Sequence, residues 1–170
     1  MNLIAISAYA VAGLAALSVA TLALPRHVSV ERVAVLEAAP EQIIALAASN
    51  AGFQRFNPYT SQDPDLKIDL FGPVSGVGSG FAFDGKDGTG RQTVAAVSVS
   101  EVVYNIDLGA LGRPTQSIAT VATDAGTEVT WRVDSDTGYN PVFRVFGVFM
   151  DRMMGPTFEL GLENLAKATA

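Results

Sequence analysis

The chain has 170 residues, about the size of one ordinary domain. Hydrophobic residues make up 49% and charged residues 16%, which predicts a sizeable core and excludes a disordered chain. With no cysteine and a single histidine, His27, the chain cannot form disulfides, thiolate sites or sites built from several histidines. The net charge is −6 and Lys and Arg do not cluster, so we expect no nucleic-acid partner.

The first feature along the chain is an apolar run without charge, over residues 3–24. As a helix it would span roughly 33 Å, enough to cross the hydrocarbon core of a membrane. The alternative is a signal peptide cleaved near Ser18-Val19-Ala20, which would leave a secreted or periplasmic domain. Signal peptides carry Lys or Arg before the apolar run, and Met1-Asn2 has neither. We therefore predict an uncleaved transmembrane anchor over residues 1–25.

Basic residues lie only on the carboxyl side of this run, where Arg26, His27 and Arg32 follow it. Cytoplasmic flanks of membrane helices carry an excess of Lys and Arg. The sequence therefore predicts a single-pass protein of the cell membrane, with its soluble domain, residues 26–170, on the cytoplasmic side.

The soluble part begins with mixed structure. Alternation over residues 28–35 predicts a strand, and residues 40–50 have helical spacing behind a first-turn proline. A shorter helix is expected to end near Phe56. The pairs Asn57-Pro58 and Asp63-Pro64 predict a polar loop, because a residue before proline avoids the helical region.

Short turns rich in Gly and Asp, such as those at 85–88 and 124–126, separate the next segments and predict an antiparallel meander. Residues 141–168 have helical spacing and predict one long helix with a kink at Gly155-Pro156, or two abutting helices. The six predicted strands of the meander are 66–71, 77–83, 91–99, 102–108, 115–123 and 128–134.

The segment GPVSGVGSGFAFDGKDGTG, residues 72–90, raises the question of a phosphate or cation site. It lacks the final spacing of a dinucleotide fingerprint and the Gly-Lys-Ser/Thr of a P-loop. It also lacks the bidentate Glu of a calcium loop, since Ala95 stands at that position. We interpret the glycines as bulge and hairpin positions, with Phe81 and Phe83 as the better ligand candidates. We expect no cofactor and no metal.

The order of elements resembles the helix-grip fold of the START-like or SRPBCC superfamily, often labelled polyketide cyclase/dehydrase. The family's opening strand, Ala-Pro helix start and aromatic-rich stretch resemble ERVAVLEAAPEQIIALAASNAGFQRFNPY. Its later signatures resemble DPDLKIDLFGPVSGVGSGFAF, GTEVTWRV and FMDRMMGPTFELGLENLAK, so the similarity covers residues 26–167. The family's tryptophans appear here as Phe53, Phe56, Tyr59 and Phe83, which lack the indole N–H donor.

The resemblance implies an α+β domain in which a curved antiparallel sheet wraps on a long C-terminal helix, and many relatives carry an N-terminal membrane helix. It implies a lipophilic ligand, such as a lipid, an isoprenoid or a polyketide-like molecule, between sheet and helix. Arg132 or Asn105 could anchor it, although Trp131 and Arg132 cannot both face inward. The candidate ligand-binding residues are Phe56, Phe71, Phe81, Phe83, Tyr104, Trp131, Phe146, Phe149 and Met153.

Two alternatives to ligand binding remain open. A cyclase, dehydratase or hydrolase would need a buried titratable residue near its substrate, and we favour a binding protein over an enzyme. A non-catalytic module that regulates a membrane complex would combine a closed core with an exposed apolar patch. The superfamily shares no catalytic motif, so no catalytic residue is assigned, and the only titratable candidates are Glu101, Asp107, Tyr104 and Arg132.

Overall fold

The structure is a computed structural model that describes residues 19–170. The predicted anchor over residues 1–25 therefore lies mostly outside the described residues. Among the helices of residues 19–170, none is both long and apolar enough to cross a membrane.

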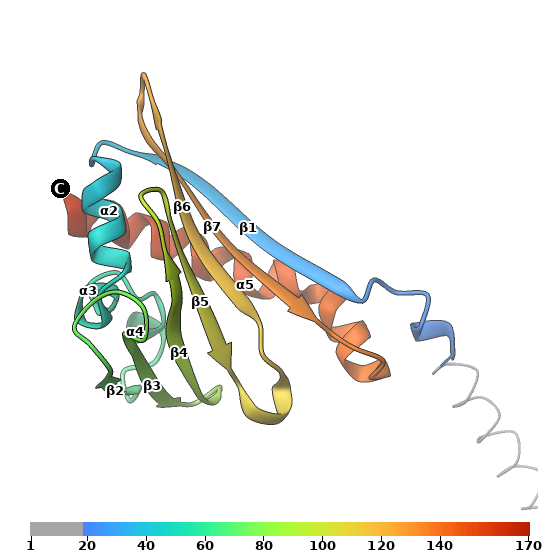
Figure 1. Cartoon of the computed structure of the whole chain (residues 1–170). Helices are drawn as coiled ribbons and strands as arrows, with labels where there is room; N and C mark the ends of the chain where they lie inside the picture. The colour runs from blue at the N-terminus through green and yellow to red at the C-terminus, as the bar shows by residue number, and fades with distance from the viewer. Residues whose placement is uncertain (1–18) are drawn as a thin grey trace, which may run out of the picture.

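Over the described residues, seven strands form one antiparallel sheet in the order β1-β7-β6-β5-β4-β3-β2 (Figure 1). Strands β2 to β7 are neighbours in both chain and sheet, and connections of two to eight residues join them. The first strand, β1, pairs with the last strand, β7, and forms one edge of the sheet. The strands are β1 (His27–Leu36), β2 (Lys67–Phe71), β3 (Gly80–Gly85), β4 (Gly88–Val97), β5 (Glu101–Asp107), β6 (Thr115–Thr123) and β7 (Gly126–Asp136).

The long helix α5 (Pro141–Thr169) lies along one face of the sheet, chiefly against β1, and continues through Pro156 (Figure 1). We call this face, which carries the buried Val30, Tyr104 and Trp131, the inner face, and the opposite one the outer face. Short helices cover one end of the inner face: α2 (Pro40–Ala47), α3 (Asn50–Gln54) and α4 (Tyr59–Gln62). The curved sheet around a C-terminal helix confirms the predicted α+β helix-grip architecture.

Two boundaries differ from the sequence prediction for local reasons, and one predicted loop contains a helix. Strand β3 begins at Gly80 and not at 77, because Gly76 and Gly78 both have a φ of +86°, outside the β region. Helix α2 ends at Ala47 because Ser49 starts a new helix, its Oγ accepting from the Gly52 N–H at 3.1 Å. Helix α4 occupies the predicted loop.

Arg32 connects β1 to α5. Its Nη1 donates to Asp151 Oδ1 at 2.8 Å, and its Nε donates to Glu159 Oε1 at 2.7 Å. Gly155 lies on α5 one turn from each of these carboxylates, and a Cβ at Gly155 would overlap the Arg32 guanidinium. Gly155 therefore makes room for the cation in the seam between helix and sheet.

Two further glycines bring α5 close to the sheet. A Cβ at Gly147 would lie 2.8 Å from Val28 Cγ2 of β1, and one at Gly161 would overlap the ring of Trp131 in β7. Gly147, Gly155 and Gly161 thus mark the side of α5 that faces the sheet.

We expect Gly155→Ala to lower the free energy of unfolding by about 1–3 kcal/mol, because the added methyl displaces the Arg32 guanidinium. In an Arg32→Ala background the same change should stabilise the protein by up to about 1 kcal/mol, since alanine favours helix over glycine. Urea unfolding followed by the fluorescence of Trp131, the only tryptophan of the chain, measures both. Equal effects in the two backgrounds would contradict this explanation.

Candidate functional site

Aromatic rings fill the inner face where α3 covers it. Phe53 of α3 is central, with its ring centroid 4.7 Å from Phe56 and 5.3 Å from Phe81. Trp131 stacks on Phe158 of α5 at 5.3 Å between centroids. Tilted and edge-on contacts at such distances hold a ring cluster together. We call the set Phe53, Phe56, Phe81, Tyr104, Trp131 and Phe158 the ring cluster; all six are buried.

The free space beside the ring cluster is small. A void of about 10 Å³ remains between α3 and strands β3 to β5, lined by residues that include Phe53, Phe81 and Tyr104. That volume accommodates one water molecule at most. Four of the predicted ligand-binding residues, Phe56, Phe81, Tyr104 and Trp131, come together and fill this part of the interior themselves.

Two buried donors in this region have no hydrogen-bond partner among the described residues. They are Trp131 Nε1, whose side chain is 0% exposed, and Gln54 Nε2 in α3. The carbonyl end of Gln54 is used, because its Oε1 accepts from Asn57 Nδ2 at 2.8 Å. A buried donor left unpaired costs about 1–3 kcal/mol. Both N–H groups are thus available to an acceptor that enters the interior.

Tyr104 is held in a different way. Its hydroxyl donates to the carbonyl oxygen of Ala47, the last residue of α2, at 2.8 Å. Complete burial raises the pKa of Tyr104 well above its usual value. Tyr104 therefore stays protonated at neutral pH and fastens α2 to β5.

Phe71 and Phe83 lie on opposite faces of the sheet. Phe83 follows Phe81 on the inner face at 6.4 Å between centroids, and its ring lies where a Cβ of Gly90 would be. Phe71 pairs with Gly80, the neighbour of Phe81, so alternation places Phe71 on the outer face, with its ring over Gly80. The prediction that Phe71 lines the interior is therefore wrong. Gly80 and Gly90 leave room for the rings of Phe71 and Phe83, respectively.

Phe146, Phe149 and Met153 do not line the interior, contrary to the prediction. Their exposed fractions are 51%, 54% and 55%. A helix turns once in 3.6 residues, so these positions project roughly opposite to the glycines that face the sheet. In the sequence, apolar residues on the buried side and on the exposed side of α5 look alike. The spacing of Gly147, Gly155 and Gly161 is the signal that identifies the side of the helix that faces the sheet. We call the exposed set Val142, Val145, Phe146, Phe149 and Met153 the apolar stripe.

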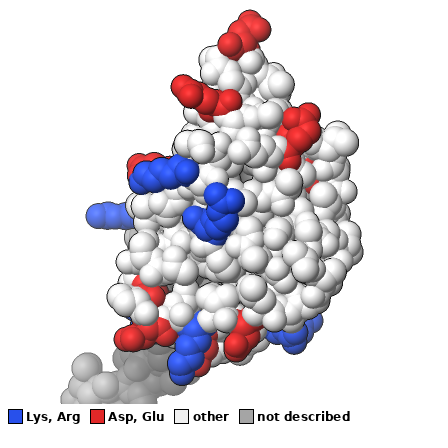
Figure 2. All heavy atoms as spheres, turned by 90° about the vertical axis from the view of Figure 1, so that its left-hand side faces the viewer, with Lys and Arg blue, Asp and Glu red and all other residues white. Residues whose placement is uncertain are grey.

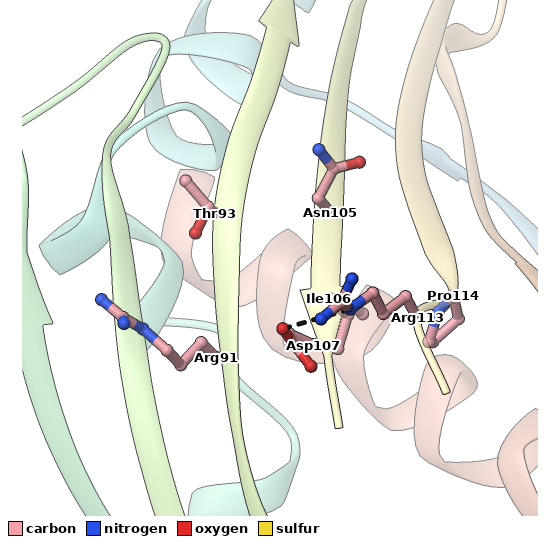
Figure 3. Close-up of a pocket in the computed structure, with 7 residues that line it drawn as sticks. All are labelled: Arg91, Thr93, Asn105, Ile106, Asp107, Arg113 and Pro114. Atoms are coloured by element: carbon pink, nitrogen blue, oxygen red, sulfur yellow. Dashed lines mark ion pairs between the residues drawn. The ribbon is translucent and has the colours of Figure 1, made fainter. Parts of the chain in front are cut away.

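A larger hollow, of about 600 Å³, lies at β4, β5 and the turn that precedes β6 (Figure 3). It has two guanidinium groups and one carboxylate. Arg91 lies over the Phe71 ring at 4.4 Å, and Arg113 Nε lies 3.3 Å from Asp107 Oδ2. The N–H of Gly109 donates to Asp107 and lowers the pKa of this carboxyl. The lining residues are Arg91, Thr93, Asn105, Ile106, Asp107, Arg113 and Pro114.

Most residues predicted for acid–base chemistry or for polar anchoring of a ligand lie on the face of the sheet opposite to the ring cluster. Asn105, Asp107 and Glu101 alternate with the buried Val102 and Tyr104, so they project from the outer face. Of the four titratable candidates only Tyr104 faces the interior.

Arg132 also projects outward, beside the inward Trp131. It forms ion pairs with Asp134 at 2.7 Å and with Glu31 at 3.4 Å. Neither Arg132 nor Asn105 is therefore placed to anchor a ligand between the sheet and α5.

Charged side chains are scattered over the face formed by α2 and α3, which is mostly uncharged (Figure 2). Within residues 19–170, His, Asp and Glu do not form a group of three that could hold a metal ion. The chemical features of the interior are its rings, two unpaired N–H donors and a pair of buried amides, in which Gln116 Nε2 lies 3.5 Å from Gln92 Oε1.

A curved antiparallel sheet around a C-terminal helix, with an aromatic interior between them, defines a helix-grip domain. The sequence matches the family described as "Polyketide cyclase / dehydrase and lipid transport" over residues 27–170, and the chain belongs to this family. No curated protein matches the chain in sequence.

Several solved structures are similar in fold. The di-domain ARO/CYC StfQ from the steffimycin biosynthetic pathway has a TM-score of 0.62 and 14% identity; the match covers 84% of this chain and 50% of StfQ, so our chain spans about half of that protein. Protein CV1439 from Chromobacterium violaceum has a TM-score of 0.61 and 11% identity, over 84% of this chain and 97% of that one. The Aha1 dimer from Colwellia psychrerythraea has a TM-score of 0.55 and 16% identity, over 84% and 96%. At these identities the likeness concerns the fold.

We expect Tyr104→Phe to lower the free energy of unfolding at neutral pH by about 1–3 kcal/mol, because the Ala47 carbonyl loses its partner. The raised pKa adds a pH dependence. Above about pH 10 the unfolded chain loses the Tyr104 proton while the folded chain keeps it, so stability falls by up to about 1.4 kcal/mol per pH unit. The variant should lose this part of the alkaline slope in urea unfolding at pH 8 to 11. An unchanged slope would contradict the assignment.

Proposed function

We propose that the chain is a membrane-tethered helix-grip domain that binds a lipophilic molecule in a site beneath α3. The bound molecule carries a hydrogen-bond acceptor. The indole N–H of Trp131 is the observation that carries the proposal. It is fully buried among aromatic rings and has no partner among the described residues. Buried donors are paired in most proteins, and a ligand carbonyl or hydroxyl oxygen would pair this one.

Binding requires the ring cluster to open, because the void beside it has only about 10 Å³. Helix α3 is the element suited to move, since it has five residues and contributes Phe53 at the centre of the cluster. When Phe53 and Phe56 move aside, packing of the apolar ligand against the remaining rings would take the place of their ring–ring packing. Gln54, the second unpaired donor, lies on the same helix.

Family membership is compatible with a carrier and with a cyclase-like enzyme. The geometry favours a carrier, because Glu101, Asp107 and Arg132 lie on the outer face and Tyr104 is neutral and hydrogen-bonded. The ligand class that fits a ring-lined interior with few polar groups is a lipid, an isoprenoid or an aromatic polyketide-like molecule.

The tether in this proposal is the apolar run at residues 3–24, long enough to cross a bilayer. Arg26 and Arg32 follow it and favour a domain on the cytoplasmic side of the cell membrane.

An interaction module that regulates a membrane complex is the second candidate. It is favoured by the combination of a nearly filled space beside the ring cluster with the exposed apolar stripe of α5. The two functions differ in whether a small molecule occupies the interior.

Native mass spectrometry of the full chain, released from membranes in mild detergent, should show a co-purified apolar molecule. Trp131→Phe keeps an aromatic ring and removes the N–H, so we expect ligand affinity to fall about tenfold. Arg132→Gln is the matched control, because the next residue on the same strand faces outward and its variant should retain the ligand.

Two results would contradict the proposal. Protein that is consistently free of ligand, with Trp131 emission unchanged by added lipids, isoprenoids or aromatic polyketides, would favour the interaction module. Equal ligand retention in Trp131→Phe and the parent protein would remove the role of the indole N–H.

A further inference from the structure

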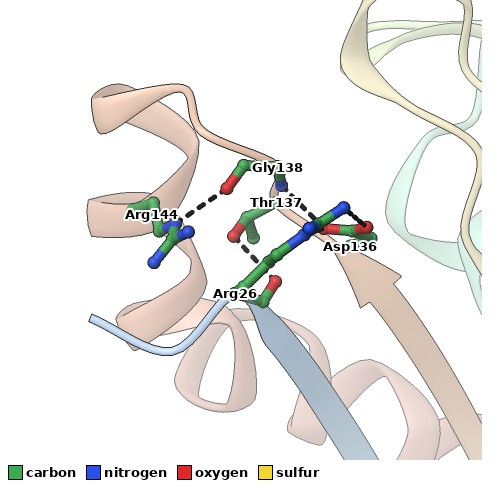
Figure 4. A network of polar contacts seen from close by, with 5 residues as sticks. All are labelled: Arg26, Asp136, Thr137, Gly138 and Arg144. Carbon is green, nitrogen blue, oxygen red and sulfur yellow. Dashed lines mark hydrogen bonds and ion pairs between the residues drawn. The ribbon is translucent and has the colours of Figure 1, made fainter. Parts of the chain in front are cut away.

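The chain enters the domain beside the first turn of α5 (Figure 1), where Arg144 of α5 also binds Gly138 (Figure 4). Arg144 is only 5% exposed. Its Nη1 donates to the carbonyl oxygens of Leu22 at 3.0 Å and Leu24 at 2.5 Å, and its Nε donates to Gly138 O at 2.8 Å. One buried cation thus joins α5 to the end of the apolar run.

A second set of contacts fixes Arg26 (Figure 4). Arg26 binds Asp136 through two hydrogen bonds of 2.8 and 2.7 Å. The backbone N–H and the hydroxyl of Thr137 both donate to Arg26 O at 2.9 Å. With Arg144 and Arg26 both bound, the segment between the apolar run and β1 is not a loose linker. The described end of the run, residues 22–24, is therefore fixed relative to α5.

The apolar stripe begins at the same end of the molecule. Val142 lies within the first turn of α5, and the stripe continues along the exposed side of the helix to Met153. Val19 and Leu22, just before the Arg144 contacts, are also exposed. Arg152 is exposed on the same stretch of helix, where a long cationic side chain can reach lipid headgroups. Exposed apolar side chains from two segments therefore gather where the chain enters.

We propose that the apolar stripe of α5 lies on the surface of the bilayer that holds residues 3–24, and that Arg144 sets this orientation. The inference rests on the membrane tether of the proposed function and is independent of the ligand beneath α3. Apolar helix faces bury about 5–10 Å into the headgroup boundary. The tether supplies a high effective concentration, so even a weak surface affinity is enough to keep the stripe on the lipid.

Because the chain has no cysteine, a single label can be placed directly. Phe149→Cys carries an environment-sensitive fluorophore on the stripe, and Asn105→Cys carries it on the outer face of the sheet. The full-length protein is reconstituted in phosphatidylcholine/phosphatidylglycerol vesicles that contain doxyl-labelled lipid. We expect strong quenching at position 149 and little at position 105.

The role of Arg144 is tested in the same assay. Arg144→Gln loses the charged donors to the Leu22 and Leu24 carbonyls, and we expect the quenched population at position 149 to fall about tenfold relative to the unquenched one. Arg113→Gln, an arginine change in the turn before β6 and away from α5, should leave the quenching nearly unchanged. Thermal unfolding of each variant shows whether a loss of quenching reflects orientation in a folded protein.

Different outcomes overturn different statements. If the emission of the label at position 149 indicates an aqueous environment, the apolar stripe does not contact the bilayer. A label that reports an apolar environment without lipid quenching means that a second copy of the chain or another protein covers it, and either result overturns the inference. Failure of the protein to remain with vesicles after alkaline carbonate would remove the tether as well. Loss of ligand binding in Trp131→Phe bears only on the site beneath α3.

Discussion

The position of α5 depends on a cation in the seam between helix and sheet. Arg32 leaves the inner face of β1 and binds Asp151 and Glu159, which lie on α5 on either side of Gly155. These contacts allow one rotation of the helix about its axis, because only a residue without a side chain leaves room for the guanidinium. That rotation decides which apolar residues of α5 are buried and which are exposed.

The two sides of α5 follow from this rotation. On the sheet side, Phe158 stacks on Trp131 and completes a ring cluster that leaves almost no free volume. On the other side, the apolar stripe lies in the open beside the point at which the chain enters the domain. The proposed ligand site uses the first side and the proposed contact with the bilayer uses the second. The rotation of α5 thus produces both the proposed ligand site and the proposed bilayer contact. A carrier that takes its ligand from a membrane would need the two together.

Much of the fold was predictable from local patterns. Alternation, turn residues and helical spacing predicted the strands and α5, and the resemblance to a known family indicated how they assemble. The predictions that were wrong concern faces. Phe71 and Phe81 belong to neighbouring strands, and only their pairing register, with Phe71 opposite Gly80, shows that the two rings lie on opposite faces. Met150 and Met153 have the same apolar character, yet one is buried and the other is exposed.

By itself, the sequence determined the strands and the long helix, their order, the absence of cysteine chemistry and the presence of a long apolar run before the domain. These depend on residue types and short-range spacing, which a sequence states directly. Only the tertiary structure decided that the rings fill their own interior, that the indole N–H of Trp131 is left without a partner among the described residues, and that Arg144 binds the carbonyls of Leu22 and Leu24. Such features arise between residues distant in the chain, where strand register and helix rotation determine which groups meet.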